Sequence, residues 1–241
     1  MPEGSVLWGL QYAGYGLEFG LLAFLLSRGF GQRPRWLCPY VAAFCTVDAV
    51  MRPWIFYRYG QSSREYYYVY WLSDALLVVC AFLLICAFFR RACSHSPELW
   101  AFLRPVLVFV LLLVLGVSSF TLSHHYRDLF TAYIFSFNQN LYFTCLVLNT
   151  ALYVMLQRLG SSDRQLELLV CGLGVQYAGS AASFALLHLT GNLSTTREAS
   201  LYLLPVCDLA RLAIWLFAVT RVTGAGTRSL TGGAEEVPVP V

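Results

Sequence analysis

The stretch Tyr66–Arg91, YYYVYWLSDALLVVCAFLLICAFFRR, decides the fold class. Its charged residues are Asp74 and the two arginines at its end. A helix needs about 20 apolar residues to cross the hydrocarbon core of a bilayer. We therefore interpret residues 67–89 as a transmembrane helix whose terminal arginines mark a membrane boundary.

The composition of the whole chain agrees with this interpretation. Hydrophobic residues make up 58% of the 241 residues and charged residues only 12%. Soluble domains contain roughly 45–50% apolar and about 25% charged residues. So few charges cannot cover the surface of a soluble globule, which excludes a cytosolic enzyme or a secreted domain.

Working outward from this segment, seven apolar stretches long enough to span a bilayer follow one another. The first carries Glu18 but lacks a basic leading region and a small-residue cleavage site, so we expect a true span and not a signal peptide. The sequence predicts an all-α polytopic bundle of seven transmembrane helices, with spans at about 5–26, 36–57, 67–89, 102–121, 130–156, 166–189 and 200–221.

The arginines predict the orientation. Alternate loops place ten of them on one side and four on the other, and Arg52 and Arg211 lie within spans. Because basic residues favour the cytoplasmic side, we expect an outside N-terminus and a cytoplasmic C-terminus in a bacterial inner membrane. We expect residues 1–221 to form the membrane domain and 222–241 a disordered cytoplasmic tail. The basic excess then reflects orientation and predicts no nucleic-acid partner.

Polar residues inside the spans are the candidate functional residues. A charge at the bilayer centre is costly, so such side chains face the protein interior or water. With the N-terminus outside, most of them fall in the outer half of the membrane. As ligand- or ion-binding candidates we take Glu18, Asp48, Arg52, Asp74, Asn138, Asp208 and Arg211.

Two acid–base pairs have helical spacing. Asp48 lies four residues before Arg52, and Asp208 three before Arg211, so each pair shares a helix face. One interpretation is two structural salt bridges. The other makes both arginines binding groups for an anionic ligand, with the aspartates as resting counter-ions.

Four acids against two arginines leave two acids without a basic partner, and Glu18 and Asp74 are the expected surplus pair. They either are protonated and hydrogen-bond a neighbouring helix, or bind a proton or a cation.

Aromatic and amide residues repeat at helical spacing near these acids. Together they could line a vestibule open to the outside, as many small-molecule sites are lined, or they could hold helices together. The two stripes are Tyr67, Tyr70, Trp71 and Asp74, and Asn138, Tyr142, Cys145 and Asn149.

Small residues predict close helix contacts, at Gly16 and Gly20 in the first span and at Gly172 and Gly179 in the sixth. The sequence carries no zinc-binding, haem-ligating, phosphate-loop or serine-nucleophile motif. We therefore expect no catalytic residue, no metal and no cofactor.

The YYYVYWLSD segment within Tyr66–Arg91 resembles the third span of an uncharacterised bacterial seven-helix integral membrane protein family, in which a Tyr-rich entry precedes YW-x-S and an acid. The resemblance implies a bacterial origin and this fold, without a mechanism. The seven-span, N-outside plan also looks like the sensory modules of some bacterial receptors and like rhodopsins. The chain has no lysine, which excludes covalent retinal attachment.

Three function classes follow. A receptor or sensor module with an outward-facing polar pocket, binding a small molecule or ion and signalling through a separate protein, fits the topology. A proton- or cation-coupled carrier of small solutes fits the surplus acids. An intramembrane lipid enzyme would need a nucleophile or a metal, and the sequence indicates neither.

Overall fold

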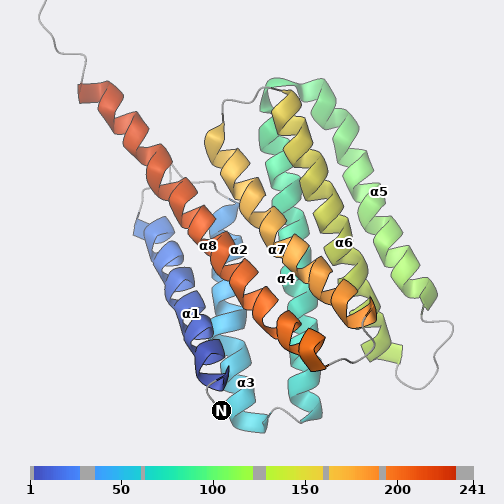
Figure 1. The fold of residues 1–241 in the computed structure, drawn as a ribbon. Helices are drawn as coiled ribbons and strands as arrows, with labels where there is room; N and C mark the ends of the chain where they lie inside the picture. Colours follow the sequence, from blue (N-terminus) through green and yellow to red (C-terminus); the bar gives the residue numbers. More distant parts are fainter. Residues whose placement is uncertain are drawn as a thin grey trace, which may run out of the picture.

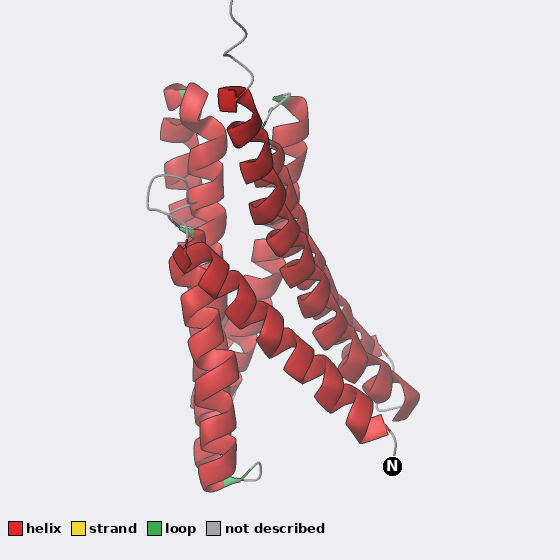
Figure 2. Ribbon diagram, turned by 90° about the vertical axis from the view of Figure 1, so that its left-hand side faces the viewer, coloured by secondary structure: helices red, strands yellow, loops and turns green. Residues whose placement is uncertain are grey.

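We describe the protein from a computed structural model, in which residues 3–27, 36–60, 63–121, 129–159, 163–189 and 194–231 are described. The regular elements in these ranges are all helices (Figure 2). Each of the seven apolar stretches predicted from sequence is helical, so the predicted all-α class is confirmed.

The helices run up and down side by side, with α1 at one edge of the bundle and α5 at the other (Figure 1). In chain order the elements are α1 (Glu3–Ser27), α2 (Leu37–Cys45), the π-helix η2 (Thr46–Met51), α3 (Arg52–Tyr59), α4 (Arg64–Ala92), the 3-10 helix η3 (Cys93–His95), α5 (Pro97–Thr121), α6 (Leu129–Arg158), α7 (Arg164–Leu189) and α8 (Ser194–Thr231).

The second helical segment, α2–η2–α3, contains a wide turn at its centre. The backbone N–H of Arg52 bonds the carbonyl of Val47, five residues back. Pro53 follows directly; it has no N–H to give to the residue four earlier, and its ring clashes with that carbonyl in a regular α-helix. The wider turn lies where the α-helical pattern cannot continue, and it carries Asp48.

A tight reversal sets this segment against α4. Gly60 ends α3 with φ of 75°, a left-handed conformation that favours glycine. The Ser63 hydroxyl oxygen accepts a hydrogen bond from the backbone N–H of Tyr66 at 3.1 Å and caps α4. The second segment and α4 therefore run antiparallel with their polar residues facing each other.

The closest helix contact in the described bundle joins α7 and α8. A Cβ atom at Gly172 would lie 2.6 Å from Trp215 Nε1, and one at Gly179 would lie 2.5 Å from Cys207 Sγ, so the contact predicted for these glycines is confirmed. The same prediction is wrong for Gly16 and Gly20, whose Cβ positions have no atom within 4 Å. These two glycines lie on an exposed face of α1.

Within the described residues, four helices are long and apolar enough to cross a membrane, at Glu65–Ala92, Pro97–Ser119, Ser136–Arg158 and Tyr202–Thr220. The chain is thus a helical membrane protein. Outward-facing α5 side chains are large and apolar: Phe102 is 69% exposed and Phe109 63%. Such a face suits contact with lipid and not with water.

The C-terminal boundary differs from the predicted one. Residues 222–231, expected to belong to a disordered tail, continue α8 as helix to Thr231. No proline interrupts the chain between Pro205 and Pro238, so nothing in this stretch blocks helix propagation. Residues 232–241 lie outside the described part of the chain.

Candidate functional site

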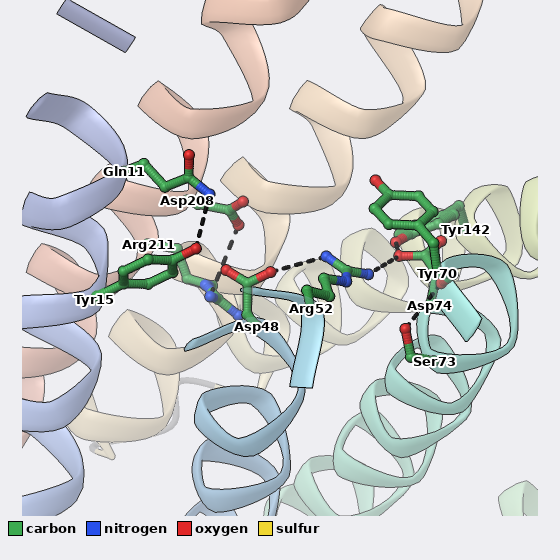
Figure 3. A network of polar contacts seen from close by, with 10 residues as sticks. All are labelled: Gln11, Tyr15, Asp48, Arg52, Tyr70, Ser73, Asp74, Tyr142, Asp208 and Arg211. Atoms are coloured by element: carbon green, nitrogen blue, oxygen red, sulfur yellow. Dashed lines mark hydrogen bonds and ion pairs between the residues drawn. The ribbon is translucent and has the colours of Figure 1, made fainter. Parts of the chain in front are cut away.

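Arg52 links the second helical segment to α4 (Figure 3). Its Nη1 atom lies 2.8 Å from Asp48 Oδ1, and its Nη2 atom lies 3.3 Å from Asp74 Oδ1. The guanidinium carbon is 4.4 Å from the centre of the Tyr70 ring, a cation–π distance. The predicted Asp48–Arg52 pair is present, and helix packing adds a second carboxylate that the spacing did not indicate.

Asp74 collects donors from two neighbouring helices. Besides Arg52, it accepts hydrogen bonds from the Tyr142 hydroxyl at 3.2 Å and from Asn138 Nδ2 at 3.2 Å. Both of these donors come from α6, four residues apart and on one face. Asp74 therefore joins α3, α4 and α6 in one network.

The predicted charge balance needs correction at Asp74. Counting by sequence left Asp74 and Glu18 without a basic partner, whereas Arg52 bridges Asp48 and Asp74. Among the described residues, the acids with a buried oxygen that makes no hydrogen bond are Glu18, at Oε2, and Asp208, at Oδ1. Spacing along one helix could not show this, because Arg52 and Asp74 are 22 residues apart.

Arg211 is enclosed by α2, α7 and its own helix. Its Nη1 atom donates to Gln176 Oε1 at 3.0 Å and to the Tyr40 hydroxyl at 3.3 Å. Its guanidinium carbon lies 4.2 Å from the centre of the Phe44 ring, and the residue is 1% exposed. The predicted partner Asp208 is 3.7 Å away, an ion pair without a hydrogen bond.

Glu18 is the most buried acid of the network. It is 3% exposed, and α1 presents it toward the same interior as Asp48, Asp208 and the two arginines, close enough for electrostatic interaction with each. Its Oε2 atom has no hydrogen-bond partner in the described part of the chain. Burying an unpaired carboxylate is costly, so a donor that reached this oxygen would stabilise it.

These charged groups surround a cavity of about 850 Å³. Side chains of the second segment, α1, α4, α6, α7 and α8 line it, whereas α5 contributes none of its lining residues. Of the seven predicted site residues, five line it: Glu18, Asp48, Arg52, Asp74 and Asp208. Arg211 and Asn138 lie behind the wall and hold lining residues in place.

The two predicted stripes have different roles. Tyr67, Tyr70 and Trp71 line the cavity together with Asp74, as a vestibule wall requires. In the α6 stripe only Tyr142 lines the cavity, while Asn149 donates to the backbone carbonyl of Val170 at 3.0 Å and joins α6 to α7. The α4 stripe thus lines a cavity, whereas Asn149 of the α6 stripe holds two helices together.

Two residues of the cavity that were not among the predicted site residues had weak sequence signals. Gln176 occurs on the same face as Gly172 and Gly179, so its inward direction was readable, but its bond to Arg211 was not. Tyr15 lies three residues before Glu18 on α1 and lines the cavity, with its hydroxyl bonded to Gln11 Nε2 at 2.7 Å. Helical spacing from Glu18 could have identified it.

The carboxylates of the cavity do not converge on one point. Within the described residues, no group of three or more His, Cys, Asp or Glu side chains could hold a metal ion. The arrangement instead offers carboxylates from different helices, in a lining that also contains aromatic rings. This chemistry suits a small molecule with both a charged and an apolar part.

Protein-family models, curated proteins and solved structures were all compared with the chain, and none matched. The resemblance of the YYYVYWLSD segment to a bacterial seven-helix family therefore stays a prediction.

Proposed function

We propose that this protein is a membrane receptor or sensor module that binds a small molecule in the cavity described above. The observation that carries the proposal is the coincidence of about 850 Å³ of space with five inward ionisable residues. Small-molecule sites have volumes of roughly 300–1,000 Å³ and a few polar groups in mostly apolar walls.

The proposal includes seven spans with the N-terminus outside, in a bacterial inner membrane. The arginine distribution supports this orientation. The cavity is lined by α4 between Tyr66 and Ala81 and by α8 between Leu204 and Leu212, stretches that this orientation places mainly in the outer half of the membrane. A ligand would then enter from outside.

Arg52 offers a way to couple binding to a change of shape. It connects the second segment to α4 through Asp74 at 3.3 Å, and Asp48 and Asp74 both line the cavity. A ligand that contacts one of these groups differently in two arrangements of the helices shifts the balance between them. We propose that a separate signalling protein reads this shift.

A cavity-filling substitution tests the proposal. Gly14 lines the cavity, and Gly16, two residues later on the same helix, is exposed and does not line it; a Cβ at either position meets no atom within 4 Å. We would screen the purified full chain in detergent against small cationic, neutral and anionic aromatic compounds, following thermal stabilisation. Gly14→Trp should abolish stabilisation by any binder, and Gly16→Trp should preserve it.

Two results would contradict the receptor proposal: no compound of any charge stabilises the protein, or a binder remains equally effective in Gly14→Trp. Either result would show that the cavity is not a ligand site.

The second candidate is a proton-coupled carrier, which the unpaired Oε2 atom of buried Glu18 favours. Reconstitution in liposomes separates the two functions. A receptor binds a stabilising compound saturably without accumulating it inside. A carrier accumulates it and changes the internal pH in step, and Glu18→Gln should uncouple the two fluxes.

A further inference from the structure

We propose that the ligand of this cavity is a small organic cation, an amine or ammonium group on an apolar or aromatic body. The inference rests on the proposed function and specifies the ligand class of that site. Three independent features of the cavity carry it: its charge balance, an unpaired buried carboxylate oxygen, and aromatic walls.

The formal charge of the lining, with every acid counted as ionised, is negative. Four acidic side chains line the cavity, those of Glu18, Asp48, Asp74 and Asp208, together with one arginine, Arg52. Arg52 is bonded to two of these carboxylates at 2.8 and 3.3 Å, so its charge is more than offset. An anionic ligand would have to displace a carboxylate from Arg52 before it could pair with this arginine. A cationic ligand could contact the acidic side chains without breaking an existing ion pair.

Arg211 does not reverse this balance. It is 1% exposed and does not line the cavity, and its Nη1 hydrogen bonds go to Gln176 and Tyr40. The Asp208 carboxylate in front of it is 39% exposed and lies 3.7 Å away. A ligand in the cavity therefore meets the carboxylate first.

Glu18 provides the anchoring group. Glu18 is 3% exposed and lines the cavity, and its Oε2 atom makes no hydrogen bond within the described residues. A buried carboxylate oxygen without a donor is stabilised when a cationic N–H or an ammonium group reaches it. The structure thus leaves unpaired carboxylate oxygens on Glu18 and Asp208, and Glu18 is the more buried of the two residues.

The walls suit the rest of a cation. Tyr15 lies one helical turn before Glu18, and Tyr67 and Trp71 face the same space from α4. Positive groups bind over aromatic faces, and this interior already contains such contacts. Arg52 lies 4.4 Å from the centre of the Tyr70 ring, and Arg211 lies 4.2 Å from that of Phe44 and 5.1 Å from that of Trp215.

The size of the cavity selects an organic cation over a bare ion. A volume of about 850 Å³ is far larger than a proton or a metal ion needs. The described acids also do not gather as a metal site. A cation with an apolar body can use the space, the aromatic surface and the acidic groups of this cavity together.

Three probes with one skeleton test the inference: 2-phenylethylamine, 2-phenylethanol and 3-phenylpropionate, which are cationic, neutral and anionic at pH 7. Their dissociation constants would be measured by calorimetry on the purified full chain in detergent. We expect the amine to bind at least about tenfold more tightly than the other two, a difference equivalent to one charged contact. Glu18→Gln should remove this preference.

The matched control is Glu98→Gln at the start of α5, an exposed glutamate that does not line the cavity; it should leave all three constants unchanged. Tyr15→Leu should weaken binding of the amine. Tyr15→Phe, which keeps the ring, should bind the amine with the wild-type dissociation constant. Thermal unfolding followed by circular dichroism confirms that each variant is folded.

Equal binding of the three probes, tighter binding of the anion, or an amine preference that survives Glu18→Gln would overturn the inference while leaving a ligand-binding cavity in place. Binding of none of the three would overturn the inference too. The broader screen with Gly14→Trp and Gly16→Trp then decides separately whether the proposed function also fails.

Discussion

Arg52 and Arg211 follow an aspartate by four and three residues, and these similar patterns lead to different environments. Arg52 keeps its local partner Asp48 at 2.8 Å and gains Asp74 from α4. Arg211 is instead drawn to Gln176, and its distance to the local aspartate grows to 3.7 Å. Contacts with adjacent helices thus determine whether an arginine stays bonded to the aspartate of its own helix.

The two carboxylates on Arg52 should differ in their effect on stability. Asp74 accepts hydrogen bonds from Arg52, Asn138 and Tyr142, whereas Asp48 accepts one from Arg52. We expect Asp74→Asn to lower the free energy of unfolding by roughly 2–3 kcal/mol and Asp48→Asn by about 1 kcal/mol, since Arg52 retains the other carboxylate. Thermal unfolding in detergent measures both; a larger loss for Asp48→Asn would contradict this assignment.

Sequence reasoning located the polar residues of the site but not all of their partners. Charged and amide residues within apolar spans are conspicuous, which is why five of the seven candidates line one cavity. Which residue of another helix each one meets depends on helix rotation and crossing. Asp74 was therefore counted as unpaired although Arg52 reaches it, and the hydrogen bond that Arg211 donates to Tyr40 had no sequence signal.

At the scale of helices, the same small-residue signal had two outcomes. Gly179 on α7 allows α8 to approach until Cys207 occupies the space of a Cβ, whereas Gly16 on α1 faces open space. A glycine in an apolar helix shows only that close approach is allowed. Helix positions were predictable from hydrophobicity, but the partner of each face was not.

This difference predicts opposite effects of alanine. At Gly179 a Cβ would lie 2.5 Å from Cys207 Sγ, so Gly179→Ala should cost about 1–3 kcal/mol by overpacking the α7–α8 contact. The control Gly116→Ala on α5 meets no atom within 4 Å and should stabilise by about 0.5–1 kcal/mol through helix propensity. Melting temperatures in one detergent compare them, and equal shifts would refute the close contact.

For the whole molecule, the arginine distribution and the position of the cavity together predict on which side of the membrane the cavity lies. If the N-terminus is outside, Gln11 and Tyr67, which line the cavity, lie toward the outer surface, and the Arg91–Asp163 ion pair of 2.8 Å lies toward the cytoplasm. Orientation therefore determines whether a ligand enters from outside or from the cytoplasm. Helix packing alone is the same in both orientations.

Reporter insertions measure this orientation. A fluorescent protein that folds only in the cytoplasm should be bright when inserted after Ser96, between η3 and α5, and dark when inserted after residue 62. Alkaline phosphatase, active only outside, should give the opposite pattern at the same two sites. The reverse result at both sites would place the cavity on the cytoplasmic side and overturn the proposed direction of entry.

The wide turn at Thr46–Met51 also governs how sequences of this kind should be aligned. Each residue of an α-helix advances the side chains by about 100° around the axis, so one residue more or less in this turn rotates everything after it by more than a quarter of a circle. A homologue lacking that residue would aim its counterpart of Arg52 at a different neighbour. A one-residue gap at this place therefore changes which residues contact one another, even where both flanks align without a mismatch.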